Sequence, residues 1–326
     1  MVSSRPSIGL VLSGGGARGL SHIGVLRVLE REGIPVDYLA GTSMGGLIAA
    51  GYAAGMSSYD MEREARIVTQ KRKLFQMVDP GLPKGGLLHG QRVHAFFKHL
   101  FGEKTFSELQ LPLAVTAVDL ITHQEITLDT GSVAMALRAT TSLPGVFMPV
   151  ELNGMRLTDG GVLNNLPVDV ARKMGAKRVI AVDISLHDQQ GIGRWIGNHR
   201  WVPGSISDTL AVMDDTLYAL RIAEQEHKLK HFPPDVLIYP DLPRNINAIA
   251  GYSHVTELIA AGERAAEEHL QDIKALMQPR AHRFLRKGTG NNNNRRIPHP
   301  SRSITDVEIN QNNIVLPKGI KNTDEL

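Results

Sequence analysis

Two patterns of apolar and polar positions alternate along the first part of the chain. Short runs rich in Val, Ile and Leu predict strands, whereas apolar residues spaced three or four apart predict helices. Through the first 185 residues this succession is typical of an α/β fold with parallel β-α-β units rather than of an all-β domain. The predicted strands are 7–13, 35–40, 111–120, 124–129 and 178–184, and the predicted helices are 21–32 and 44–54.

The pattern changes after residue 185. Two longer helical patterns, at 208–230 and 254–278, enclose a predicted strand at 235–239. After Gln278 the periodicity is lost, and 286–326 is too polar to offset the entropy of ordering it, so we expect it to be disordered. We therefore divide the chain into a core at 8–185, a helical extension at 186–278 packed on the core, and a basic, then polar, tail at 279–326.

Composition narrows the class of protein. With 326 residues, 42% of them hydrophobic and 21% charged, the chain is long enough to bury a substantial core. It has no cysteine, which excludes a disulfide scaffold, a thiolate nucleophile and Cys-ligated zinc or iron–sulfur sites. The first apolar run is shorter than the core of a signal peptide, about 7–15 residues, so we predict a cytoplasmic location. The stretch 39–56 is interrupted by Thr42, Ser43 and five glycines and does not predict a membrane span.

The basic character of the chain belongs to its tail. Residues 279–303 contain seven Lys and Arg and no acidic residue, whereas residues 1–278 carry a net charge of −2. Peripheral contact with an anionic membrane, unspecific contact with nucleic acid and a solvated tail all agree with this distribution. The single aromatic residue, Phe284, does not favour base stacking, so we expect no specific nucleic-acid partner.

A glycine-rich run follows the first predicted strand and precedes the first predicted helix. Glycines there let backbone N–H groups surround an anion at a helix N-terminus. A dinucleotide-binding site would need an acidic residue about 20 positions later, at the end of the second strand. Asp37 stands at the start of that strand instead, which disfavours this alternative. The run reads Gly14, Gly15, Gly16, Ala17, Arg18, Gly19.

The second predicted strand ends in a Gly-x-Ser-x-Gly motif. Its residues are Gly41, Thr42, Ser43, Met44 and Gly45, followed at once by a predicted helix. In a strand-turn-helix setting this motif is typical of a nucleophile elbow, in which small residues flank a serine at the tip of the strand. The alternative is a glycine-rich turn in which Ser43 caps the helix. Because both glycine motifs end neighbouring strands, we expect them side by side at one edge of the sheet.

A serine nucleophile needs a base to take its proton. In the order Ser, Asp or Glu, His, the histidine would be His187 or His254. His22, one helical turn after the glycine run, is better interpreted as a packing or capping residue. A carboxylate candidate is Asp159, which follows the strand-like run 154–157 and precedes Gly160 and Gly161. Alone, this Asp-Gly-Gly sequence usually indicates a turn.

Taken together and in this order, the three motifs resemble the signatures of the patatin-like phospholipase family. The resemblance is strongest to bacterial members related to neuropathy target esterase. The stretches 139–149 and 161–167 also resemble family blocks on either side of the aspartate, so that the match covers roughly 8–185. The chain has Asp-Gly-Gly where many relatives have Asp-Gly-Ala, a difference of one methyl group.

The resemblance implies a three-layer fold with a mainly parallel central sheet flanked by helices. It also implies a dyad of Ser43 and Asp159 with no histidine, no metal and no cofactor. The substrates implied are lipid acyl esters such as phospholipids or lysophospholipids. The alternatives are an esterase or thioesterase with a Ser-His-Asp arrangement and a non-catalytic, lipid-binding regulatory relative. The oligomeric state is not decided by the sequence.

In this mechanism the glycine run supplies the oxyanion hole. The N–H groups of Gly15, Gly16 and Ala17 are the expected donors, and Arg18 either adds positive charge or holds the loop through an ion pair. An apolar segment is a second candidate feature, because it can either line an acyl groove or bury one face of a helix against the sheet. Its residues are Phe96, Phe97, Leu100, Phe101 and Phe106.

Overall fold

A central sheet organises the molecule. The computed structural model describes residues 5–69, 78–79, 86–185, 204–243, 246 and 250–278. The strands of the main sheet follow the order β10-β9-β1-β2-β4-β8-β7, with β5 paired to β4, and β3 and β6 form a separate pair. Their bounds are β1 (Ile8–Leu12), β2 (Tyr38–Gly41), β3 (Gly86–Leu88), β4 (Leu113–Asp119), β5 (Gln124–Leu128), β6 (Gly145–Phe147), β7 (Val150–Leu152), β8 (Met155–Asp159), β9 (Arg178–Val182) and β10 (Val236–Ile238).

Strands β10, β9, β1, β2 and β4 are all parallel, which confirms the mainly parallel sheet. Strands β5, β7 and β8 run antiparallel to their neighbours, and the β-α-β interpretation did not foresee this. The physical reason is the length of the connections. Only short turns join β4 to β5 and β7 to β8, and a parallel pair needs a crossover of a dozen or more residues.

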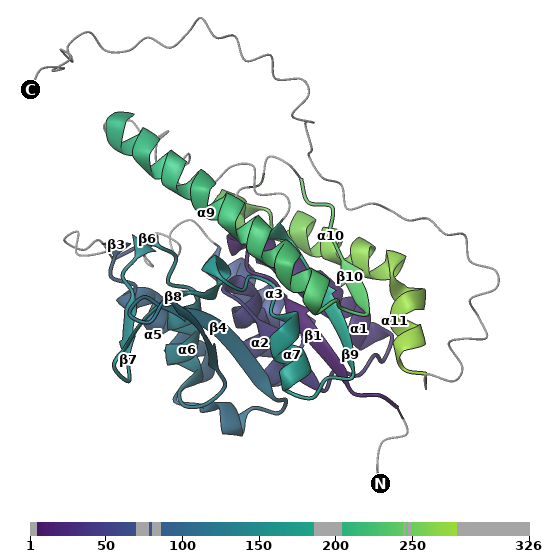
Figure 1. The fold of residues 1–326 in the computed structure, drawn as a ribbon. Coiled ribbons are helices and arrows are strands. Elements are labelled where there is room, and N and C mark those ends of the chain that lie inside the picture. The colour runs from purple at the N-terminus through teal and green to yellow at the C-terminus, as the bar shows by residue number, and fades with distance from the viewer. Residues whose placement is uncertain are drawn as a thin grey trace, which may run out of the picture. The chain divides into compact units, whose positions relative to one another are not determined.

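Helices cover both faces of the sheet, which confirms the three-layer α/β architecture (Figure 1). Side chains alternate along β1, so that Leu10 and Leu12 point into a large apolar cluster shared with α1 and α10. Val11 points into a smaller cluster with Val168 and Val170 of α7. The α-helices are α1 (Ser21–Arg31), α2 (Met44–Ala53), α3 (Ser58–Val68), α5 (Gln91–Phe101), α6 (Val133–Thr140), α7 (Val168–Lys173), α9 (Gly204–His231), α10 (Val255–Glu268) and α11 (Leu270–Leu276).

Four short 3₁₀ turns complete the described elements. They are η1 (Gly16–Leu20), η2 (Phe106–Glu108), η3 (Gly160–Val162) and η5 (Ala250–Ser253). The helix predicted at 254–278 is two helices, because His269 between them has φ −99° and ψ 4°, outside the helical region. The change of direction brings Ile273 and Leu276 into the core, where they are 0% and 1% exposed.

Helix α10 packs on α1 with the two backbones in contact. A Cβ atom added at Gly24 of α1 would overlap the carbonyl oxygen of Ile259 in α10. In the same way, a Cβ atom at Gly262 of α10 would overlap the carbonyl oxygen of Ser21 in α1. Hydrogen at both positions is therefore what allows these two helices to approach so closely.

Helix α9 is held on the opposite face by charged side chains. Lys228 Nζ lies 2.5 Å from Glu125 Oε2 of β5 and 3.8 Å from Asp169 Oδ2 of α7. Asn164 Nδ2 donates hydrogen bonds to Glu125 and to Asp169 as well. Since these groups are mostly buried, this network connects α9 to both β5 and α7.

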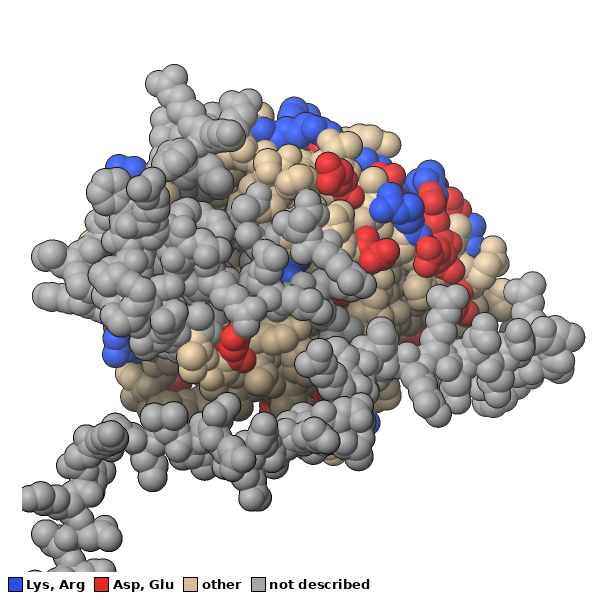
Figure 2. Space-filling model, turned by 90° about the horizontal axis from the view of Figure 1, so that it is seen from above, with Lys and Arg blue, Asp and Glu red and all other residues tan. Residues whose placement is uncertain are grey.

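Charges of both signs are mixed on the face shown in Figure 2 rather than sorted into patches. Elsewhere in the described residues, ion pairs join neighbouring helices, including Arg31 with Glu267 and Lys274 with Glu32. None of the helices within the described ranges combines the length and hydropathy needed to cross a membrane. His187 and the tail at 279–326 lie outside the described residues.

The division of the chain at residues 185 and 278 stays a prediction, as does the cytoplasmic location. Strand β10 extends the main sheet next to β9, and α10 contributes buried side chains to the large apolar cluster. The described residues after 185 thus share the sheet and core of the residues before it.

Candidate active site

Two strands that run toward each other bring Ser43 and Asp159 together. Strand β5 occupies one edge of β4 at residues 115–119, so the partners β2 and β8 must both use the other edge. Gly41, the last residue of β2, pairs with Val115, and Asp159, the last residue of β8, pairs with Ala117. The antiparallel strands therefore end two positions apart on the same neighbour, a separation of about 7 Å.

Ser43 occupies a sharp turn between β2 and α2. Its backbone has φ 53° and ψ −123°, a conformation that side chains rarely adopt. Its N–H donates a hydrogen bond of 2.8 Å to Thr140 Oγ1 of α6. The strained turn and this bond fix the direction of the serine, as expected for a nucleophile elbow.

The glycines of the elbow are required by close packing. A Cβ atom at Gly41 would lie 2.7 Å from the carbonyl oxygen of Gly45, and one at Gly45 would overlap the carbonyl oxygen of Leu12 in β1. Thr42 between them is fully buried, and its Oγ1 lies 2.7 Å from Thr116 Oγ1 of β4. The motif therefore fits a tight crossing of α2 over the ends of β1 and β2.

Asp159 is buried, with 4% of its surface exposed. Its backbone N–H donates to the carbonyl oxygen of Ser142, and its Oδ1 accepts a 2.7 Å hydrogen bond from the N–H of Gly161. Burial raises the pKa of its carboxyl group, against the opposing effects of the Arg221 charge, the Ser43 hydroxyl and the Gly161 N–H. The effect of the Ser43 hydroxyl on this pKa indicates that the two side chains lie next to each other.

The glycine run lies beside the serine. A Cβ atom at Gly14 would be 3.1 Å from Ser43 Cβ. The N–H of Gly14 donates to the carbonyl oxygen of Asn165, so it is already used. Gly15 and Gly16 are half-buried and open the η1 turn, where the first N–H groups have no partner within the helix. Ala17 is buried inside the turn, which leaves Gly15 and Gly16 as the better-placed donors.

Arg18 and Gly19 serve the packing of the same loop. The side chain of Arg18 is 1% exposed, and its Nε donates to the carbonyl oxygen of Gly15. This contact fits the alternative in which Arg18 holds the loop in place. A Cβ atom at Gly19 would lie 2.8 Å from Met44 Cβ, so this glycine leaves room for the residue after the serine.

Asn165 is a residue of the site to which sequence reasoning gave no role. Its carbonyl oxygen accepts from the N–H of Gly14, and its Nδ2 donates to the carbonyl oxygen of Gly14. A Cβ atom at Gly161 would lie 2.9 Å from Asn165 Oδ1 and 3.0 Å from Asp159 Oδ1. Asn165 thus connects the glycine run to the aspartate motif. The signal was present, because the Asn-Asn pair follows Gly161 closely in the sequence.

The two described histidine candidates do not pair with Ser43. His22 is fully buried, its Nε2 donates to the carbonyl oxygen of Ser13, and burial lowers its pKa to about 4. It is therefore a neutral packing residue, as interpreted from the sequence. His254 is partly exposed, and its Nδ1 lies 3.0 Å from Glu257 Oε2 on its own helix.

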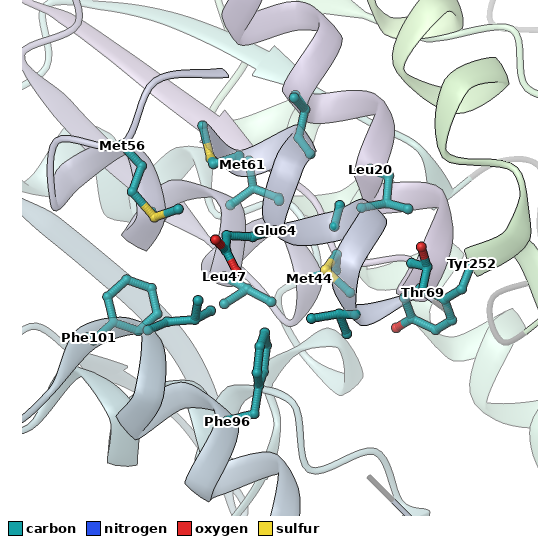
Figure 3. A pocket seen from close by; sticks show the side chains of 16 residues that line it. Leu20, Met44, Leu47, Met56, Met61, Glu64, Thr69, Phe96, Phe101 and Tyr252 are labelled. Carbon is teal, nitrogen blue, oxygen red and sulfur yellow. The ribbon is translucent and has the colours of Figure 1, made fainter. Parts of the chain in front are cut away.

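An apolar cavity begins next to the nucleophile (Figure 3). It encloses about 560 Å³ of empty space, part of it open to solvent. Met44 and Leu47 of α2 face Phe96 and Phe101 of α5 across it. Of the five apolar residues singled out from the sequence, Phe96, Leu100 and Phe101 line the cavity. Phe97 and Phe106 do not line the cavity, and both are buried in the core.

Sequence reasoning did not identify Arg221 as a residue of the site. It belongs to α9, and its positive charge acts on Asp159 although 62 residues separate them in the chain. A single arginine within a long helical pattern carries no signal of its own, and only the packing of α9 reveals its position. Among the described residues, no group of three or more His, Asp or Glu side chains is arranged to hold a metal ion.

The fold and the site together define the class of this protein, an α/β protein with the geometry of a serine hydrolase. A family model described as "Patatin-like phospholipase" matches residues 10–172, which is half of the chain. The chain belongs to the patatin-like phospholipase family. The resemblance drawn from the three motifs is thereby confirmed, and so is the class of carboxylic ester hydrolase at the level of the family.

Relatives of the neuropathy target esterase type are among the similar proteins. Human "Patatin-like phospholipase domain-containing protein 6" is 37% identical over 193 residues, covering 58% of this chain and 14% of that protein. "Lysophospholipase NTE1" of Candida albicans is 30% identical over 290 residues, covering 84% of this chain and 21% of that protein. An "Uncharacterized NTE family protein" of Mycobacterium tuberculosis is 32% identical over 183 residues, covering 56% of this chain and 50% of that protein.

The chain thus spans half or less of the length of these relatives. Among solved structures, the crystal structure of VipD from Legionella pneumophila aligns with a TM-score of 0.45 and 15% identity. The alignment covers 84% of this chain and 68% of that one.

Proposed function

We propose that the protein is a serine acyl hydrolase of lipid esters in which Ser43 is the nucleophile and Asp159 the base. The observation that carries the proposal is the meeting of β2 and β8 on one edge of β4, which gives the serine hydroxyl a buried carboxylate as its partner. The family of the chain supports the reaction class, and the names of its relatives support lipid substrates.

The first half-reaction forms an acyl-enzyme. Ser43 Oγ attacks the ester carbonyl carbon while its proton passes to the carboxylate of Asp159. The N–H groups of Gly15 and Gly16 donate to the resulting oxyanion, and each such donor is worth about 3 kcal/mol of barrier. The bond to the alcohol then breaks, and the proton held by Asp159 moves to the departing oxygen.

The second half-reaction releases the fatty acid. Water attacks the acyl carbonyl carbon and gives a proton to Asp159, which returns it to Ser43 Oγ as the acyl–serine bond breaks. The raised pKa of Asp159 makes it a stronger base than an exposed carboxylate. A single residue can therefore serve both halves without a histidine.

We further propose that the apolar cavity holds the acyl chain of the substrate. It begins at Met44, the neighbour of the nucleophile, and apolar side chains form most of its wall. Replacing Phe96 by Trp is expected to reduce turnover of long-chain esters several-fold relative to short-chain esters. An unchanged ratio of the two rates would contradict this assignment.

A peripheral contact of residues 279–303 with anionic membranes is proposed from the charge of this segment alone. Its seven Lys and Arg side chains contribute about 1 kcal/mol each near such a surface. The segment lies outside the described residues, so no contact within the structure enters this proposal.

Labelling with a fluorophosphonate probe tests the central proposal. We expect the probe to modify Ser43, as identified by mass spectrometry of the labelled peptide, and Ser43→Ala to abolish both labelling and ester turnover. Ser57→Ala is a suitable control, because Ser57 caps α3 away from the dyad. Modification of another serine in a folded sample would refute the assignment.

A further inference from the structure

A second cleft, which shares no lining residue with the apolar cavity, also adjoins the nucleophile. It encloses about 300 Å³ of empty space, part of it open to solvent. Gly14 and Gly15 of the glycine run form one wall, with Asn165 beside them, and Tyr218 and Arg221 of α9 form another. Because Gly14 lies next to Ser43, the cleft adjoins the place of the ester in the proposed function.

Within the described residues, Arg221 has few hydrogen-bond partners for an arginine that lines a cleft. Its Nε is buried and donates no hydrogen bond to the described part of the chain. By contrast, the guanidinium group of Arg138 donates to the carbonyl oxygens of Gly90, His89 and Met148 and to Ser142 Oγ. A buried N–H group without an acceptor is costly, and an anionic ligand would supply an acceptor.

Arg18 and Arg221 both line the cleft. Two buried acids lie nearby. Asp183 already accepts hydrogen bonds from Ser185 and Gln225, and burial raises its pKa. Burial also raises the pKa of Asp159, on which the charge of Arg221 acts. Two arginines beside the glycine run are a setting suited to an anion.

Each of the two spaces has a lining residue next to the serine, and the two share no lining residue. The apolar cavity starts at Met44, directly after Ser43, and the cationic cleft starts at Gly14, whose added Cβ atom would be 3.1 Å from Ser43 Cβ. An acyl ester of glycerol phosphate has the same three parts in the same order, an acyl chain, a carbonyl group and, one glycerol unit further, a phosphate. A neutral acylglycerol has no charged group for the cleft.

We propose that Arg221 is a specificity-determining residue that binds the phosphate of a glycerophospholipid or lysophospholipid and so favours it over a neutral acylglycerol. The inference rests on the proposed function, because it assumes that the ester is cleaved at Ser43. Arginine suits the role, since its planar guanidinium group donates two parallel hydrogen bonds to phosphate oxygens. The residue lies outside 10–172, the part of the chain that the family model matches.

A comparison of two substrates tests the proposal. Lysophosphatidylcholine and monoacylglycerol with the same acyl chain are presented in the same detergent micelles to the wild type, Arg221→Gln and Arg221→Lys. We expect Arg221→Gln to lower the ratio of kcat/KM for lysophosphatidylcholine over monoacylglycerol at least tenfold, mainly through KM. Arg221→Lys is expected to restore part of this ratio, because it keeps the charge but loses the two-point contact.

Lys230→Gln is the matched control on the same helix, because Lys230 is exposed and its loss removes a positive charge without touching the cleft. An equal loss for both substrates in Arg221→Gln, with a shifted pH profile, would overturn the proposal in favour of a positioning role through Asp159. An unchanged ratio would also overturn it.

Binding without turnover separates this inference from the proposed function. We expect glycerol 3-phosphate to bind Ser43→Ala by titration calorimetry, and the affinity to fall at least tenfold when Arg221→Gln is added. Inorganic phosphate binding as tightly as glycerol 3-phosphate would indicate a site for the free anion and refute the lipid assignment. Ester turnover that persists in Ser43→Ala would refute the proposed function, whereas the calorimetric result stands independently of it.

Discussion

Ser43 combines an unfavourable backbone conformation with a buried acidic partner, and both features have consequences that can be measured. Its positive φ is held by the packing of Gly41 and Gly45 against neighbouring backbone, and its partner Asp159 is nearly inaccessible to water. Strain and burial of this kind reduce stability and persist only where the surrounding structure enforces them. Substitutions at the dyad are therefore expected to change activity and stability in opposite directions.

Replacing Asp159 by Asn removes the base but keeps the shape of the side chain. We expect kcat to fall by about 10²–10⁴-fold, the usual contribution of general base catalysis. His254→Gln, which alters a surface pair with Glu257, is the control and should retain wild-type turnover. Turnover of a short acyl ester measures the change in kcat. Wild-type turnover in Asp159→Asn would rule out the dyad.

The same substitution is expected to alter the dependence of stability on pH. Because burial raises the pKa of Asp159, the folded state holds this proton more tightly than the unfolded chain. The contribution of Asp159 to stability is then full below its unfolded pKa, about 3.9, and is lost as pH rises through the higher folded pKa. The free energy of unfolding of Asp159→Asn relative to wild type should therefore increase over this window, as measured by urea denaturation at a series of pH values. A difference that does not vary with pH would contradict the raised pKa.

The pH dependence of catalysis follows from the same group. Asp159 acts as a base only when ionised, so kcat/KM should rise with pH and reach its plateau above the folded pKa of this residue. The midpoint is expected above about 3.9, the ordinary value for an aspartate. A stopped assay on an uncharged ester measures it, and a midpoint at or below the ordinary value would contradict the assignment of the base.

At the scale of elements, the fold depends on close contacts of helices α10 and α9 that do not tolerate substitution. Helices α1 and α10 meet at Gly24 and Gly262, where added Cβ atoms would overlap backbone carbonyl oxygens. Helix α9 depends instead on the charge of Lys228, which lies between Glu125 and Asp169. The first contact is steric and the second electrostatic, so they respond to different substitutions.

Gly262→Ala separates packing from helix propensity. In an exposed helix this change would stabilise the protein by about 1 kcal/mol. Here we expect destabilisation by about 1–3 kcal/mol or more, because α10 must move away from α1. Thermal unfolding measures the effect, and Glu268→Ala at an exposed position of the same helix is the control. A higher melting temperature for Gly262→Ala would disprove the close contact.

Lys228→Met should weaken the attachment of α9. It leaves Glu125 without its cation and Asp169 with only the exposed Lys173, at a cost of about 3 kcal/mol. We expect faster amide hydrogen exchange in the second half of α9 and a lower free energy of unfolding. Lys230→Met on the same helix serves as the control. Equal protection in both variants would show that α9 is held by its apolar contacts alone.

At the scale of the whole molecule, the distribution of charge separates two functions. Residues 1–278 carry a net charge of −2 and include the complete candidate site, whereas residues 279–303 carry +7. On the face shown in Figure 2, basic and acidic side chains of the described residues are mixed, which does not favour adsorption to an anionic surface. Membrane contact and catalysis are therefore expected to be separable.

Deleting 279–326 should abolish binding to vesicles that contain anionic lipid while leaving turnover of a micellar neutral ester unchanged. Deleting only 304–326, which carries a net charge of −2, is the matched control and should retain binding. Binding by the wild type should decrease steeply with added salt, because it depends on charge. Vesicle sedimentation measures all three results, and equal binding by both deletions would exclude a role for 279–303.

The sequence by itself determined the strands β1, β2, β4, β5, β9 and β10, because β-branched and other apolar residues recur there at short spacing between turn residues. It also determined the family, because Gly41, Gly45 and the glycine run are required by local backbone packing that hardly any other residue tolerates. Packing requirements of this kind act between residues that are close in the sequence, so short motifs reveal them.

Only the tertiary structure decided which distant residues meet at the candidate site. The antiparallel direction of β8 brings Asp159 to the end of β2, and nothing in the sequence around Asp159 indicates that direction. The packing of α9 likewise brings Arg221 to the same site from far along the chain. Such juxtapositions depend on the pairing of strands and on the rotation of helices about their axes. Strand pairing and helix rotation are set by the sum of many contacts across the core, so no single residue predicts them.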